Sequence, residues 1–259
     1  MYSDVFLTGT VQKIYEPADG ICYAKIKCTK TIQTNAGPVT SYVNVLLKQK
    51  EGYEQYVGKM EERDLVFARG YLEVNEYGNP VVGTKGLPVF VLVPWTVRIL
   101  GETVSESIND EFSVTVMGYL GKDPDMRYLQ DGTAVTNISI ASTRYFKSPN
   151  GESAKESTWW RVAWWRNQAE TIANYCRKGS RLLVVGSINY DDQTHGPKVF
   201  ERKDGTTGSS FEVTGLSFSL ADSKGENGGS RHEQGVNPNN EFGSDGNSAP
   251  VEEDDSIPL

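Results

Sequence analysis

Cysteine and histidine are both scarce in this chain. It has three cysteines, Cys22, Cys28 and Cys176, and two histidines, His195 and His232, among 259 residues. An odd and scattered set of cysteines argues against a disulfide framework and is typical of a reducing compartment. No second pair of ligands completes a zinc site beside Cys22 and Cys28, and no Ser/His/Asp or Cys/His arrangement surrounds either histidine. The sequence therefore predicts no metal, no cofactor and no catalytic centre, and we expect a protein that is not an enzyme.

Long apolar runs are also missing. No stretch approaches the roughly 18–20 apolar residues that a membrane-spanning helix needs. The opening residues, MYSDVFLTGT, have neither the basic nor the apolar region of a secretory signal, and they lack the arginines of an organelle-targeting peptide. We therefore expect no membrane association and a cytoplasmic location.

Positive charge is outnumbered by negative charge. The chain has 26 Lys and Arg against 34 Asp and Glu, a net charge of −8. Residues 221–259 hold nine acids and two bases, and their net charge of −7 leaves −1 for residues 1–220. This last segment has almost no large apolar residues, so it is expected to be a disordered acidic tail. Because the body is nearly neutral, a basic surface must come from how its charges are placed.

The rest of the chain contains two similar sets of five short apolar runs. VFLTGTV (5–11) parallels VTVMGYL (114–120), and DLVFARGYL (64–72) parallels SRLLVVGSI (180–188). Runs of this length between turn residues predict β-strands.

One helix is predicted between the third and fourth strands of the second set. Within NQAETIANYCRKG (167–179), Asn167 is placed to cap the start, Glu170 completes a capping box, and Gly179 suits the end. The first set has only the shorter stretch GYEQYVGKM (52–60) at the same place.

Five strands with a helix between the third and fourth is the layout of an OB-fold, a five-stranded Greek-key barrel. We therefore predict an all-β chain of two tandem OB-fold barrels, with one larger sandwich as the alternative. The predicted domains are residues 1–104, 105–220 and the tail, 221–259.

Four of the five tryptophans lie in TWWRVAWWRN, residues 158–167. Since side chains of a strand alternate between faces, Trp160 and Trp164 share one face, and Trp159, Arg161 and Trp165 share the other. Arg161 is expensive to bury without a partner. The face that carries it is expected to point outward, and the other face inward, into the barrel or toward another subunit. Exposed indoles beside a guanidinium form a platform on which unpaired bases stack. The alternative is that all four tryptophans are core or oligomer contacts.

Other aromatic and basic residues are further candidates for contact with nucleic acid. STRYFKSPNGESAKEST (142–158) interleaves Arg144, Tyr145, Phe146 and Lys147, which suits unpaired bases and phosphates, although an ordinary hairpin would also explain it. Tyr190 and Lys198 are weaker candidates in a long hairpin, 189–210, that solvation alone could explain.

The first set offers fewer such residues. Alternation places Tyr42 and Lys48 outward in YVNVLLK (42–48) and places Val43, Val45 and Leu47 inward. This barrel is expected to bind nucleic acid more weakly or over a different stretch, and a purely structural role is the alternative.

Three stretches carry a resemblance to a known family. They are VMGYLGKDPDMRYLQDGTAVTNISIAST (116–143), WWRVAWWRNQAETIANYCRKGSRLLVVG (159–186) and the final EEDDSIPL (252–259). Together they resemble the bacterial single-stranded DNA-binding protein family, and the extra first barrel is similar to its two-barrel members of the Deinococcus–Thermus type.

The resemblance implies sequence-nonspecific binding and protection of single-stranded DNA in replication, recombination and repair. It places Trp159, Trp165 and Phe146 at base-stacking positions, and Trp160 near a subunit interface. It also implies a homodimer with four barrels, favoured here over a tetramer. A different OB module, such as an RNA-binding or primosomal accessory protein, is the alternative.

The acidic tail is expected to recruit replication and repair proteins. An apolar end follows its acids, unlike a plain solubilising extension, and Leu259 stands where the family more usually has phenylalanine. The residues predicted to bind partners are Asp254, Asp255, Ile257, Pro258 and Leu259.

Overall fold

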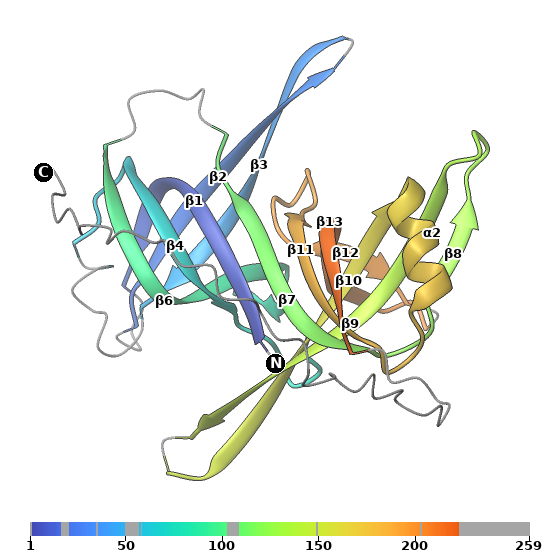
Figure 1. Ribbon diagram of the computed structural model, residues 1–259. Helices are drawn as coiled ribbons and strands as arrows, with labels where there is room; N and C mark the ends of the chain where they lie inside the picture. Colours follow the sequence, from blue (N-terminus) through green and yellow to red (C-terminus); the bar gives the residue numbers. More distant parts are fainter. Residues whose placement is uncertain are drawn as a thin grey trace, which may run out of the picture. The chain divides into compact units, whose positions relative to one another are not determined.

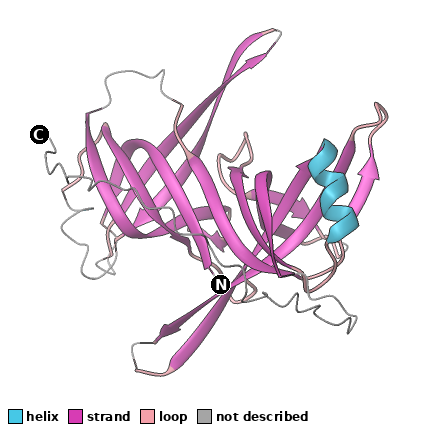
Figure 2. Cartoon of the chain, viewed as in Figure 1, coloured by secondary structure: helices cyan, strands magenta, loops and turns pink. Residues whose placement is uncertain are grey.

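The computed structural model describes residues 2–16, 21–34, 36–49, 57, 59–102, 109–148, 150–202 and 204–222. Strands dominate these residues, and the helix among them that the structure describes in full is drawn in cyan in Figure 2. The first strand set (Figure 1) is β1 (Tyr2–Tyr15), β2 (Tyr23–Thr34), β3 (Gly37–Lys48), β4 (Asp64–Leu72), β5 (Val81–Val82) and β6 (Pro88–Glu102). The second set is β7 (Phe112–Leu120), β8 (Asp125–Tyr128), β9 (Ala134–Lys147), β10 (Ser153–Trp165), the helix α2 (Arg166–Tyr175), β11 (Arg181–Asn189), β12 (Lys198–Glu201) and β13 (Thr207–Asp222).

The first set closes into a barrel, called here the N-terminal barrel. Its strand order β1-β2-β3-β6-β4 returns to β1, because β1 pairs with both β2 and β4. All pairs are antiparallel except β3 with β6. A register shift between Val11 and Lys13 interrupts β1 where it pairs with β2, and such irregularities bend a strand. This bend helps one strand of 14 residues to pair with both of its neighbours in the barrel, β2 and β4.

The second set closes in the same way into the C-terminal barrel. The order β7-β11-β13-β10-β9 returns to β7 through Tyr119 and Leu120, which pair with β9. The parallel pair is again between the third and fifth barrel strands, here β10 and β13. The prediction of an all-β chain of two tandem OB-fold barrels is therefore confirmed. The predicted boundary at residues 104 and 105 and nearly all of the tail lie outside the described residues, so these domain limits stay predictions.

The two barrels are joined edge to edge, which the sequence did not predict. β1 pairs antiparallel with β7, from Tyr2 opposite Met117 to Leu7 opposite Phe112, so that both barrels share one continuous sheet. Both belong to one compact unit, Met1–Lys224. Edge pairing removes two exposed strand edges that would otherwise be open to other chains.

The capping prediction for the helix is wrong. α2 begins at Arg166, directly after β10, and Trp165 occupies its N-cap with an extended backbone and no side-chain hydrogen bond. Asn167 is already inside the helix, so its side chain cannot cap the start, and its carbonyl accepts a bond from Thr171 instead. The helix ends at Tyr175, well before Gly179. In the described part of the chain, no helix has the length and apolar character needed to cross a bilayer.

Candidate nucleic-acid interface

Strand β10 separates its side chains as the alternation predicts. Trp160, Val162 and Trp164 are 0%, 1% and 0% exposed, whereas Trp159 and Trp165 are 37% and 46% exposed. Trp160 packs on Phe211 with ring centroids 5.2 Å apart, and its Nε1 donates to the Ser142 hydroxyl at 3.2 Å. Both inward indoles therefore belong to the core of the C-terminal barrel, and the outward indoles face solvent.

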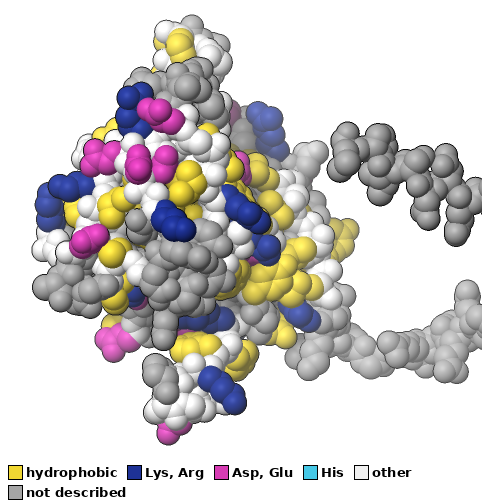
Figure 3. Space-filling view, turned by 90° about the vertical axis from the view of Figure 1, so that its left-hand side faces the viewer, with side chains coloured by type: hydrophobic (Ala, Val, Ile, Leu, Met, Phe, Trp, Pro, Cys, Tyr) yellow, Lys and Arg dark blue, Asp and Glu magenta, His cyan; other side chains and the backbone are white. Residues whose placement is uncertain are grey.

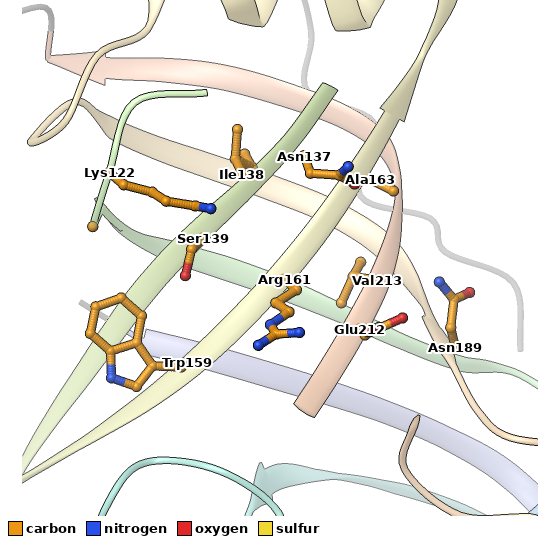
Figure 4. Close-up of a pocket in the computed structure, with 11 residues that line it drawn as sticks. Lys122, Asn137, Ile138, Ser139, Trp159, Arg161, Ala163, Asn189, Glu212 and Val213 are labelled. Atoms are coloured by element: carbon orange, nitrogen blue, oxygen red, sulfur yellow. The ribbon is translucent and has the colours of Figure 1, made fainter. Parts of the chain in front are cut away.

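A groove of about 620 Å³ lies beside the outward face of β10. The side chains of Trp159 and Arg161 project from β10 into this groove, and the side chain of Lys122 extends toward β9 from the loop after β7 (Figure 4). The residues that line it are Gly121, Lys122, Asn137, Ile138, Ser139, Trp159, Arg161, Ala163, Asn189, Glu212 and Val213. The groove thus joins one exposed indole, two cations and several amide or hydroxyl groups, which suits a base with its phosphate.

The guanidinium of Arg161 remains available to interact with a ligand. Its guanidinium lies 4.4 Å from the ring centroid of Phe200, a cation–π contact. Among the ion pairs formed by described residues, none involves Arg161, although Glu212 is its register neighbour on β13. A flat guanidinium resting on an aromatic ring can still pair with a phosphate or stack on a base.

Trp165 does not share this groove with Trp159. It lies six residues further along β10, about 20 Å away in an extended strand, and directly precedes α2. The structure therefore brings together Trp159 and Arg161, two members of the predicted platform, and places the third at a separate exposed position.

The hairpin of β9 and β10 projects from the C-terminal barrel (Figure 1) and carries the second predicted group. Tyr145 is 74% exposed, and Phe146 and Lys147 are also exposed. Arg144 differs, because its Nε lies 2.8 Å from Glu156 and its guanidinium lies over the rings of Tyr71 and Phe146. Three of the four residues are accessible, and the arginine is already paired.

The remaining predicted residues contact other parts of the chain. Tyr42 stacks on His195, with centroids 3.7 Å apart, and the His195 Nδ1 lies 3.0 Å from the Tyr42 carbonyl oxygen. The Tyr190 hydroxyl is 2.7 Å from that of Ser41, and burial raises the pKa of Tyr190. These contacts connect the β11–β12 loop with β3, so Tyr42 and Tyr190 contribute to the junction between the barrels.

Lys48 and Lys198 are both half-buried. The Lys48 Nζ lies 2.8 Å from Glu73. Burial alone would lower the pKa of Lys48, but the hydrogen bond and the charge of Glu73 raise it above its ordinary value. Lys48 is thus charged and already neutralised, which leaves it little attraction for a phosphate.

Sequence reasoning missed several residues of the groove. Asn137 and Ser139 alternate outward along VTNISIAS, and this pattern could have revealed them. Lys122 lies in a turn, and its approach to β9 depends on how the strands pair. Figure 3 shows basic and acidic side chains interspersed on the face of the molecule that it presents.

Comparisons with known proteins agree on one family. The model of the single-strand binding protein family matches residues 112–218. The chain is 43% identical over 91 residues to a single-stranded DNA-binding protein of Enterococcus faecalis, covering 34% of this chain and 47% of that protein. It is 37% identical over 126 residues to one of Oceanobacillus iheyensis, covering 49% and 73%. The first of these alignments spans only about half of the relative's length.

A solved structure resembles both barrels together. The wild-type single-stranded DNA binding protein from Thermus aquaticus superposes with a TM-score of 0.56, over 88% of this chain and 97% of that one. A deletion mutant of that protein gives the same score over 87% and 98%. Sequence identity is 22% in both cases, so the likeness concerns the fold.

Proposed function

Because this chain belongs to the single-strand binding protein family, whose members bind DNA and are not enzymes, we propose that it coats and protects single-stranded DNA without sequence preference. The observation that carries this proposal is one groove in which the exposed indole of Trp159 lies beside Arg161, which forms no ion pair with any described residue. Every base has a π-face, so stacking holds bases of any sequence, and the cation holds the backbone. Replication, recombination and repair are the processes that expose such strands, and we place the protein in the cytoplasm with the nucleoid.

The residues proposed to bind DNA differ in how much each is expected to contribute to the affinity. Trp159, Arg161 and Lys122 line the groove, and Trp165, Tyr145, Phe146 and Lys147 extend the path at exposed positions. The contributions of the other predicted residues are proposed to be smaller, since most of them contact the protein itself: Arg144, Tyr190, Lys198, Tyr42 and Lys48.

The experiment that tests this function compares ligands. A dT oligomer, a U oligomer of equal length and a duplex should compete for the protein at one salt concentration. We expect the dT oligomer to bind best and the duplex worst. Equal or tighter binding of the U oligomer would favour an RNA-binding module instead.

Replacing Arg161 by glutamine is expected to reduce the salt dependence of binding. A cation that neutralises one phosphate of a single strand contributes about −0.7 to the slope of log K against log salt. The slope should therefore become less steep by about 0.7 in titrations of a dT oligomer. Lys85→Gln, at an exposed turn of the N-terminal barrel, is the matched control and should leave the slope unchanged. An unchanged slope for Arg161→Gln would show that Arg161 does not contact a phosphate.

We further propose that two chains associate to give four barrels. The outward face of the shared sheet carries apolar side chains that register places together and that are at least partly exposed: Tyr2, Phe6, Phe67, Met117, Tyr119, Leu183 and Val185. These apolar side chains share the face with polar ones such as Asp4, Arg69 and Thr115, and a mixed face of this kind suits association with a second copy. Sedimentation should give the mass of two chains, and the mass of one or four would contradict the dimer.

The tail residues Asp254, Asp255, Ile257, Pro258 and Leu259 lie outside the described residues, and we propose that they dock replication and repair proteins. An apolar end behind acids suits a basic-rimmed apolar pocket. Deleting residues 252–259 should leave the affinity for a dT oligomer within about twofold while abolishing capture of these partners. If the truncated protein still captures these partners, the tail is not their docking site and acts only as a solubilising extension.

A further inference from the structure

The indole of Trp159 is confined at both ends by glycines, one from each barrel. A methyl group added to Gly121 would lie 2.7 Å from Cζ3 and 2.9 Å from Cη2, on the benzo ring. A methyl group added to Gly78 would lie 2.9 Å from Cδ1, on the pyrrole ring. A Cβ atom essentially never lies this close to a heavy atom to which it is not bonded, so any side chain at either glycine would displace the indole or its surroundings.

The glycine of the N-terminal barrel sits in a tight loop, Asn75–Pro80. The Asn75 N–H donates to the Asn79 carbonyl at 2.9 Å. The Asn75 Oδ1 accepts from the backbone N–H groups of Tyr77 and Asn79, at 2.9 and 3.2 Å. Gly78 has a φ of +76°, a conformation that glycine adopts without strain. These hydrogen bonds lie within the loop, so they stabilise its shape independently of its contacts with the C-terminal barrel.

The loop is bonded directly to strand β10. The Trp159 N–H donates to the Gly78 carbonyl at 3.0 Å, just before the residues of β10 that pair with β13. A methyl group on Gly78 would also collide with the Ser157 carbonyl, so the loop and the strand approach too closely for any other residue. The N-terminal barrel therefore contacts both the backbone and the ring of the residue that carries the proposed function.

We propose that the Asn75–Pro80 loop is a positioning element, through which the N-terminal barrel holds the Trp159 indole in the orientation that receives a base. This inference rests on the proposed function and adds a role for the N-terminal barrel that needs no DNA contact of its own. A ring held in place before binding loses less rotamer freedom when the base arrives. Freeing the ring is expected to weaken binding about two- to tenfold.

A double-mutant cycle tests the loop against the ring. Gly78→Ala should weaken binding of a dT oligomer about two- to tenfold in the otherwise native chain. In a Trp159→Ala background the same change should weaken binding less, because the ring through which the loop acts is gone and only the collision with the Ser157 carbonyl remains. Gly86→Ala is the matched control, since Gly86 lies in the same barrel with the same φ of +76° and has no atom within 4 Å of an added methyl. It should leave affinity unchanged.

A second variant guards against misfolding of the first. Asn75→Ala removes the acceptor of two loop bonds without adding a clash, so the same coupling to Trp159 is expected. Far-ultraviolet circular dichroism checks that each variant is folded. If Gly78→Ala does not fold, the coupling between the loop and Trp159 is measured with Asn75→Ala alone. Equal losses in both Trp159 backgrounds, or no loss in the native one, would overturn the positioning role. An unchanged affinity for Trp159→Ala alone would instead overturn the proposed platform.

Discussion

Replacing Trp159 by alanine is expected to weaken binding of a dT oligomer by about 1–3 kcal/mol, which is the range for losing one stacked base. The indole is exposed, lines the groove beside Arg161 and makes no contribution to the inner face of β10. Its removal should therefore reduce affinity and leave the barrel folded. Titration followed by fluorescence anisotropy of a labelled oligomer measures the loss, and thermal unfolding checks the fold.

Trp165→Ala is the matched control for this prediction. It removes the same side chain from the same outward face of the same strand, but at a position outside the groove. We expect a smaller loss of affinity for this variant. Equal losses would mean that the groove is not the centre of the site, and no loss for Trp159→Ala would mean that the platform is wrongly assigned.

Replacing Trp164 by alanine is expected to lower the free energy of unfolding by about 3–5 kcal/mol, the range for truncating a buried aromatic side chain. Trp164 is fully buried, meets Phe218 edge to face at a centroid distance of 5.2 Å, and fills the space above Gly215, where an added methyl would lie 2.6 Å from its ring. We expect these neighbours to close only part of the cavity that the indole leaves. Urea unfolding at a fixed chain concentration measures the change.

The neighbouring Trp165→Ala variant also controls this experiment. Its side chain is nearly half exposed, and truncation at a surface position usually changes stability by about 0.5 kcal/mol or less. A large difference between adjacent tryptophans would follow directly from the two faces of β10. Similar small losses for both variants would contradict the assignment of the faces.

The sequence predicted the faces of β10 because a single charged residue settled them. Arg161 could not be buried without a partner, so it had to point outward. The alternation of side chains along a strand then assigned a face to each of the remaining residues of β10. The same rule placed Val43, Val45 and Leu47 inside the N-terminal barrel, where all three are fully buried. The two tandem barrels followed from repeated strand patterns, which depend on residues close together in the chain.

What the sequence could not predict depends on residues far apart in the chain. The pairing of β1 with β7 joins two strand edges whose side-chain patterns do not reveal their partner. Tyr42 looked like an exposed aromatic, but His195, 153 residues away, stacks on it. Lys48 looked like a free cation, but Glu73 neutralises it. The cap of α2 was wrongly predicted because β10 continues into the helix without the loop residue that a capping box requires.

Quenching of intrinsic tryptophan fluorescence by a dT oligomer reports directly whether bases reach the exposed indoles. The native chain should be strongly quenched at saturation, and Trp159→Ala should lose a large part of that quenching, while the buried Trp160 and Trp164 contribute little. Fluorescence that does not change on binding, or quenching that is the same with and without Trp159, would mean that no base stacks on this indole.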